Sequence, residues 1–120
     1  MPVVLVADDE TYIRDLIRRA LKNRPYTVLE ATEGNETLEI LKTHNVDLLI
    51  LDLVMPKKGG IETFMETRES NRDIKIIVIT GKINTEDDAV QGLTDQFGID
   101  AVIAKPFDMK NLLHVIEELV

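Results

Sequence analysis

The sequence predicts one α/β domain in which five parallel strands alternate with five helices. The chain has 120 residues, a length at which a single hydrophobic core is usual. Short aliphatic runs alternate with amphipathic segments of helical period, and no internal repeat interrupts this order. Uninterrupted apolar strands separated by such helices are typical of a parallel sheet with helices on both faces.

The first half of the chain contains three strands and two helices. Val3–Ala7 is an apolar run rich in valine, as expected of a strand buried on both faces. Apolar residues then recur every three or four positions among basic ones, which predicts an amphipathic helix ending before Pro25. A strand, a helix and a second buried strand follow over Thr27–Ala31, Gly34–Thr43 and Leu48–Leu51.

The second half continues the alternation with three helices and two strands. In chain order these cover Gly60–Glu69, Lys75–Thr80, Thr85–Phe97, Ala101–Ala104 and the residues after Asp108. One face of the first of these helices carries Ile61, Phe64, Met65 and Arg68. Thr85 and Asp88 resemble a capping box at the start of the second helix, and Asp108 is a suitable N-cap for the last.

The composition excludes several classes of function. The 14 basic and 22 acidic residues give a net charge of −8, which disfavours direct binding to nucleic acid or to an anionic membrane. There is no cysteine, so a disulfide scaffold, a thiolate metal site and a cysteine nucleophile are excluded. No apolar run is long enough to span a bilayer. We therefore expect a cytoplasmic domain.

Polar residues follow four of the five predicted strands. In chain order they are Asp8, Asp9 and Glu10, then Asp52, then Thr80 and Gly81, and finally Lys105. Ligands of open parallel sheets bind beyond the carboxyl ends of the strands. If the first and third strands are neighbours, carboxylates converge there and repel one another unless a cation is present. Hard oxygen ligands with room for water suit Mg²⁺.

Asp52 differs from the other acids because four aliphatic residues precede it directly. A carboxylate in that position needs a buried partner or a functional reason. It could be a metal ligand, or a nucleophile that accepts a phosphoryl group. Thr80 offers a hydroxyl and Lys105 a compact cation for phosphate oxygens. Taken alone, Asp8 and Asp9 could simply stabilise a helix N-terminus, so the functional interpretation depends on the joint pattern.

This ordered set resembles the response regulator receiver domains of two-component signalling. The resemblance covers residues 3–120 and is carried by the paired acids, by Asp52 in an Asp-x-x-Met-Pro pattern closed by Gly60, by Thr80, and by Lys105 followed by Pro and Phe. It implies a flavodoxin-like, doubly wound sheet with the strand order 2-1-3-4-5. It also implies one receiver domain over residues 1–120, with no effector domain in this chain.

The resemblance further implies a role for each site residue. Asp52 would accept the phosphoryl group, Lys105 would pair with it, and Thr80 would be the switch hydroxyl. The Mg²⁺ ligands would come from Asp8, Asp9, Asp52 and the backbone carbonyl of Val54. The donor would be a phosphohistidine on a sensor histidine kinase or a histidine phosphotransfer protein, or a small acyl phosphate. The fourth helix, fifth strand and fifth helix would form the effector face of a monomer or a phosphorylation-linked dimer.

The chain departs from the family pattern in two places. Val102 stands three residues before Lys105, where the family usually has Tyr or Phe. Movement of a loop by Thr80 is therefore the expected route of switching. The stretch from Thr80 to Lys105 is also a few residues longer than usual, with the extra length expected around residues 94–99.

Two other classes of protein share parts of this pattern. A Mg²⁺-dependent phosphohydrolase with an aspartyl-phosphate intermediate commonly has a second acid two residues after the nucleophile, where this chain has Val54. A flavodoxin-like nucleotide binder needs a first loop that accepts phosphate, but the loop Asp8–Thr11 is acidic and lacks glycine. We therefore expect a signalling switch that does not turn over a small substrate.

Overall fold

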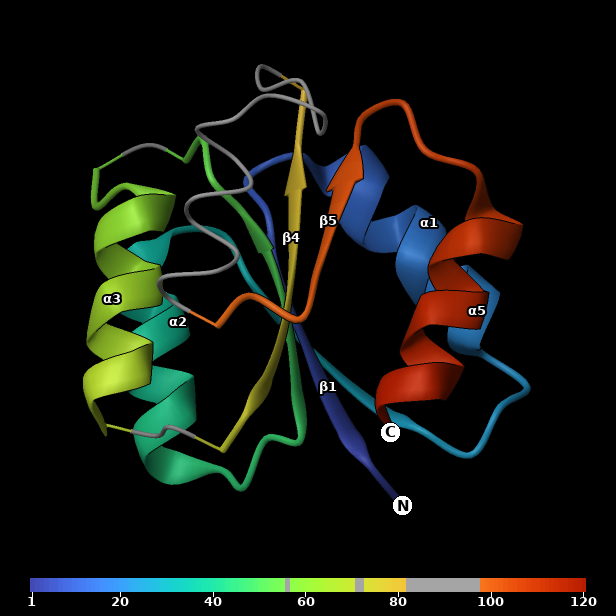
Figure 1. Ribbon diagram of the computed structural model, residues 1–120, viewed down its shortest axis with the longest axis horizontal. Coiled ribbons are helices and arrows are strands. Elements are labelled where there is room, and N and C mark those ends of the chain that lie inside the picture. The colour runs from blue at the N-terminus through green and yellow to red at the C-terminus, as the bar shows by residue number, and fades with distance from the viewer. Residues whose placement is uncertain (56, 71–72, 82–97) are drawn as a thin grey trace.

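Five parallel strands form one sheet in the order β2-β1-β3-β4-β5, which confirms the predicted order (Figure 1). This computed structural model describes residues 1–55, 57–70, 73–81 and 98–120. The strands are β1 (Val3–Ala7), β2 (Thr27–Ala31), β3 (Leu48–Asp52), β4 (Lys75–Thr80) and β5 (Ala101–Ala104). The helices are α1 (Thr11–Leu21), α2 (Gly34–Thr43), α3 (Gly60–Ser70) and α5 (Met109–Leu119). The predicted helix Thr85–Phe97, with its capping box at Thr85 and Asp88, lies outside the described residues.

Helices cover both faces of the sheet, with α1 and α5 on one side and α2 and α3 on the other (Figure 1). Successive side chains of a strand point to opposite faces. Val4 and Val6 therefore pack with residues of α1 and α5, while Leu5 and Ala7 pack on the side of α2 and α3. Because both faces are covered, all five residues of Leu48–Asp52 are buried. This double burial explains the continuous aliphatic runs.

The orientation of α3 differs from the apolar face seen in the sequence. Ile61 and Met65 are each 48 % exposed, whereas Phe64, Thr63 and Thr67 are buried. Each threonine hydroxyl donates to the carbonyl four residues earlier, at 2.9 and 2.8 Å respectively. These hydroxyls are satisfied inside the helix, so threonine can be buried without an unpaired polar group. Of the apolar residues that share a face of α3 in the sequence, only Phe64 is buried, so hydrophobicity alone does not identify the side of α3 that meets the core.

Arg68 joins the end of α3 to the entrances of β4 and β5. Its Nη1 donates to the carbonyl of Ile74 at 2.6 Å, and its Nη2 donates to the carbonyl of Gly98 at 2.6 Å. The same Nη2 lies 3.3 Å from Oδ2 of Asp100, and the guanidinium stands 5.8 Å from the centre of the Phe64 ring. The guanidinium presents its N–H donors in a planar fork, which here reaches acceptors on three separate residues.

Candidate functional site

The predicted site residues lie at one edge of the sheet, where the strands end. Asp8 follows β1, Asp52 and Thr80 are the last residues of β3 and β4, and Lys105 follows β5. Because β1 and β3 are paired, with Ala7 opposite Leu51, the two carboxylates stand side by side. Asp8, Asp52 and Thr80 are only 2 %, 4 % and 0 % exposed. The carboxyl ends of the strands therefore bring together residues that are far apart in the sequence.

Lys105 is the cation of this site. Its Nζ lies 2.8 Å from Asp8 Oδ2, 2.9 Å from Glu10 Oε1 and 3.2 Å from Asp52 Oδ2. The ammonium is also withdrawn from solvent, with a side chain that is 14 % exposed. Among the described residues, three carboxylates surround one ammonium, so this group of side chains has an excess of negative charge.

Hydrogen bonds fix Asp8 in a single orientation. Its Oδ1 accepts from the backbone N–H of Glu10 at 2.9 Å. Its Oδ2 is buried and, among the described residues, receives no hydrogen bond, although the Lys105 ammonium is its close ion partner. A buried carboxylate oxygen with free acceptor capacity is available to a ligand in the site.

The loop after Asp52 is held against the end of β3. Oδ1 of Asp52 accepts from the backbone N–H of Val54 at 3.0 Å. Farther along the loop, Lys57 has the left-handed backbone φ of 62°, and the N–H of Gly60 donates to the carbonyl of Leu53 at 3.2 Å. Pro56 of the Asp-x-x-Met-Pro pattern lies outside the described residues. The loop thus returns to the strand and fixes one oxygen of Asp52.

Glu10 joins the acidic cluster, whereas Asp9 does not. One carboxylate oxygen each from Asp8, Glu10 and Asp52 lies within 4.8 Å of the other two. Asp9 is exposed and, within the described ranges, belongs to no such group. The sequence showed Glu10 among the acids after the first strand, but gave no reason to prefer it to Asp9 as a member of the site. The direction of the turn after β1 makes that choice.

Thr80 and Val102 occupy the neighbouring strands β4 and β5. The backbone carbonyl of Thr80 accepts from the N–H of Lys105 at 2.9 Å, so the ends of these strands are joined directly. A side chain added at Gly81 would contact the stem of Lys105, with Cβ atoms 3.5 Å apart. Val102 is half-buried and packs with the core on the side of α2 and α3.

Burial and charge shift two pKa values in this cluster. Burial raises the pKa of Asp52 above its ordinary value, and the neighbouring Asp8 raises it further. The Val54 hydrogen bond and Lys105 lower it, but not enough to reverse the change. Burial alone would lower the pKa of Lys105, yet its contacts with Asp8 and Glu10 raise it above the usual range. The lysine is therefore charged at neutral pH, while ionised Asp52 is destabilised by its surroundings.

We expect Asp52→Asn to stabilise the metal-free protein at pH 7 by on the order of 1 kcal/mol. The raised pKa means that ionised Asp52 weakens the folded state at pH above that pKa. This penalty falls as pH decreases through the raised value and disappears below the ordinary value of 3.8. Urea melts at several pH values should therefore show a difference in the free energy of unfolding between the two proteins, and this difference should disappear in acid. Saturating Mg²⁺ should reduce or reverse this difference in stability, because the ion stabilises the native state to which it binds. A less stable metal-free variant would contradict the expectation.

The residues of the cluster fit a hard divalent cation. The side chains grouped here, Asp8, Glu10 and Asp52, offer carboxylate oxygens, which Mg²⁺ prefers over nitrogen or sulfur donors. Oδ2 of Asp8 is oriented into the cluster without a hydrogen bond from the described residues. A cation would also relieve the repulsion among the three carboxylates.

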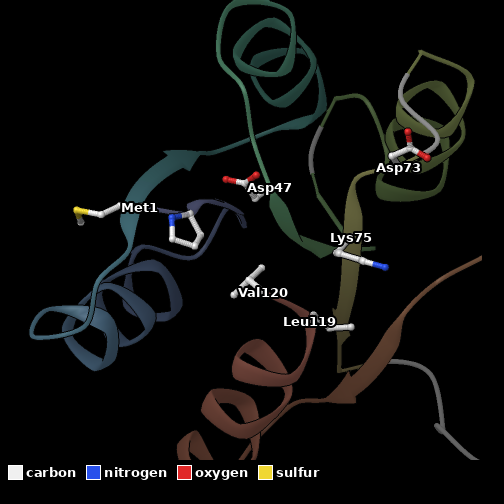
Figure 2. A pocket seen from close by; sticks show the side chains of 7 residues that line it. Met1, Asp47, Asp73, Lys75, Leu119 and Val120 are labelled. Carbon is white, nitrogen blue, oxygen red and sulfur yellow. The ribbon is translucent and has the colours of Figure 1, made fainter.

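A separate pocket lies at the opposite edge of the sheet, where β3 and β4 begin (Figure 2). Its volume is about 530 Å³, and the described residues that line it include Asp47, Lys75 and Leu119. The pocket is remote from the carboxylate cluster, and within the described part of the chain no group of three close carboxylates lies there. None of the described helices has the length and apolar character needed to cross a membrane.

Comparisons with known proteins agree with the fold. Residues 4–117 match the response regulator receiver domain. The chain is 36 % identical over 110 residues to the response regulator MprA of Mycobacterium ulcerans, covering 92 % of this chain and 46 % of that protein. It is 39 % identical over 104 residues to the regulatory protein VanR of Enterococcus faecium, covering 87 % of this chain and 43 % of that protein. The chain thus spans a little under half the length of these curated relatives.

Solved structures show the same architecture over almost the whole chain. The response regulator protein TrrA of Thermotoga maritima, solved in complex with Mg(2+)-BeF, is 32 % identical with a TM-score of 0.86, and the alignment covers both chains fully. A CheY-like receiver domain protein of Methanospirillum hungatei JF-1 is 26 % identical with a TM-score of 0.89. That alignment covers 98 % of this chain and 92 % of the other.

Proposed function

This chain belongs to the response regulator receiver domain family, whose members are phosphorylation-dependent switches, and we propose that Asp52 is the residue that accepts the phosphoryl group. One observation carries the proposal. The Asp52 carboxylate is 4 % exposed at the end of β3 and is surrounded by two other acids and one lysine. The test compares the uptake of phosphate by the unchanged chain with that by Asp52→Asn.

We further propose Mg²⁺ as the cofactor. Receiver domains bind Mg²⁺ through acidic residues, and the similar TrrA protein was solved in complex with Mg(2+)-BeF. Here the direct protein ligands would be Asp8, Asp52 and the Val54 carbonyl, with Glu10 close enough to take part. The resemblance also names Asp9 as a ligand, but Asp9 is exposed and lies outside the carboxylate cluster. When bound, the ion would neutralise charge on phosphoryl oxygens and hold them near Asp52.

The group transfer needs positioning more than acid–base chemistry. One oxygen of Asp52 attacks the phosphorus of a phosphohistidine in line with its P–N bond. A new P–O bond forms as the P–N bond breaks, and the imidazole leaves with the electron pair of that bond. Lys105, which is already within 3.2 Å of Asp52, then pairs with a phosphoryl oxygen. A small acyl phosphate can replace phosphohistidine, with a P–O bond broken instead.

The switch would start from Thr80. A phosphoryl group on Asp52 offers acceptor oxygens to the Thr80 hydroxyl and to Lys105, which draws the ends of β4 and β5 towards the site. The backbone hydrogen bond between these two residues links the movements of both ends. The response would bias two arrangements of the face formed by β5, α5 and the segment 82–97, which lies outside the described residues.

We expect Thr80→Ala to reduce the phosphorylation-dependent chemical shifts of β5 and α5 by at least about half, because it removes the switch hydroxyl. Val102→Ala should change them much less, since Val102 packs with the core and has no ring to move. Both variants should still accept phosphate at Asp52. NMR spectra of the amide groups, recorded with and without an acyl phosphate, show which of the two variants loses more of these shifts. The reverse ranking would show that residue 102 couples the site to its surface.

Partners and location follow from the family as further proposals. A sensor histidine kinase or a histidine phosphotransfer protein would supply the phosphoryl group, and a downstream effector would read the altered face. The domain would act in the cytoplasm, as a monomer or a phosphorylation-linked dimer, without turnover of a small substrate. Incubation with para-nitrophenyl phosphate tests the phosphohydrolase alternative. Incubation with a flavin or a dinucleotide tests the nucleotide-binding alternative.

A further inference from the structure

The loop that carries Asp8 is held from outside the site by Arg14. The Nη1 of Arg14 donates to the backbone oxygen of Asp8 at 2.7 Å. Its Nε lies 3.3 Å from Oε1 of Glu30 on β2, and its Nη2 donates to the Thr11 hydroxyl at 3.3 Å. The Arg14 side chain is only 13 % exposed. Three nitrogens of one withdrawn guanidinium thus contact the loop, the helix and the edge strand.

With this contact, every polar group of Asp8 except one is engaged in a hydrogen bond. The N–H donates to the carbonyl of Ala31 at 3.1 Å, and the carbonyl accepts from Arg14. Oδ1 accepts from the N–H of Glu10 at 2.9 Å. These hydrogen bonds fix the orientation of Oδ2, which is the oxygen that faces Lys105 and the other carboxylates. The position of Oδ2 depends on how firmly the Asp8 backbone is held.

We propose that Arg14, oriented by Glu30, is a positioning residue that sets the place of Asp8 Oδ2 relative to Asp52 and so tunes the affinity of the site for a divalent cation. The inference rests on the proposed function in one respect, that the acidic cluster binds such a cation. Metal sites require ligands held in place by outer partners, and loss of an outer partner commonly weakens binding by about tenfold or more. A planar guanidinium suits this role because its N–H groups can bond to acceptors on three different residues at fixed angles.

Arg18 is a matched comparison one helical turn farther along α1. Its Nη1 lies 3.4 Å from Oε2 of the same Glu30, and its Nη2 lies 2.7 Å from Oδ1 of Asp15. The Arg18 side chain is 52 % exposed and contacts none of the described residues of the β1–α1 loop. Both arginines pair α1 with β2, but only Arg14 reaches the backbone of Asp8. The two variants therefore separate the loss of a helix–strand ion pair from the loss of the loop contact.

The first test measures the binding of Mg²⁺ and Mn²⁺ to the whole chain by titration calorimetry. We expect Arg14→Met to weaken both by about tenfold, and Arg14→Lys to restore part of that loss. Arg18→Met should stay within about twofold of the unchanged protein, since exposed ion pairs contribute little. Arg14→Met combined with Glu30→Gln should be no weaker than Arg14→Met alone, because Glu30 acts through Arg14. Equal losses in the two methionine variants, or an additive double variant, would overturn the proposal.

The second test measures amide hydrogen exchange and needs no metal. Arg14→Met should speed exchange at Asp8 and Glu10 by about tenfold while leaving the core amide of Ile50 unchanged. Arg18→Met should leave all three unchanged. If the unchanged protein binds neither ion, the proposed cation site fails, yet exchange still decides the role of Arg14. Unaltered exchange at both loop amides would overturn the positioning role, whatever the metal data show.

Discussion

We expect Asp52→Asn to abolish the uptake of a phosphoryl group from acetyl phosphate, whereas the unchanged chain takes up one group and only with Mg²⁺ present. Asparagine keeps the shape of the side chain but is too weak a nucleophile to attack phosphorus. It also removes one of the three carboxylates that would hold the cation. Intact mass spectrometry counts the groups added to each protein, and a chelator should remove the uptake by the unchanged chain.

Two further variants make this result specific to the site. Asp9→Asn changes an exposed acid outside the carboxylate cluster, so it should retain most of the uptake. Lys105→Met removes the ammonium that lies within 3.2 Å of Asp52, so it should slow the uptake by about 100-fold. Phosphate that is still incorporated by Asp52→Asn would show that another residue is the acceptor. Equal loss in Asp9→Asn would show that Asp9 is a direct ligand.

We expect Gly60→Ala to destabilise the protein by about 3–5 kcal/mol, the largest effect on stability among the variants considered. A Cβ at Gly60 would lie 2.4 Å from both the carbonyl oxygen of Asp52 and the Cα of Leu53. These are backbone atoms of β3 and its loop, so no flexible side chain can move aside. Either the start of α3 or the loop after Asp52 must shift. Urea melts give the loss of stability, and the shift should also lower phosphate uptake.

Gly59→Ala is the matched control for this substitution. A Cβ at Gly59 would meet no atom of the described residues within 4 Å, so the change should stay within about 0.5 kcal/mol. The two variants alter adjacent residues in the same way and differ only in what the new methyl group contacts. If Gly60→Ala were as stable as Gly59→Ala, α3 would not begin against the end of β3.

Most of the fold could be predicted from the sequence because its signals are local. A strand buried on both faces needs an unbroken aliphatic run, and Leu48–Leu51 is such a run. The structure extends this strand by one residue, to Asp52. A helix end has its own chemistry as well: Asp108 caps α5 as predicted, with its side chain accepting from the N–H of Lys110 at 2.9 Å.

The candidate site could be predicted in outline for a related reason. Each of its main residues stands directly at the end of a recognisable strand, and parallel strands end at one edge of the sheet. Asp8, Asp52 and Lys105 are therefore marked as neighbours by the order of elements, although they are far apart in the chain. The sequence by itself thus determined the fold class, the approximate positions of the described strands and helices, and the placing of Asp8, Asp52 and Lys105 at one end of the sheet.

Only the tertiary structure decided three other features. They are the membership of Glu10 rather than Asp9 in the cluster, the contact of Arg14 with the Asp8 backbone, and the burial of threonines on α3. Each depends on the direction of a turn, the reach of a side chain between elements, or the rotation of a helix about its axis. Hydrophobic periodicity records which residues are apolar, but these features arise from directional hydrogen bonds and charges between elements that meet only when the chain has folded.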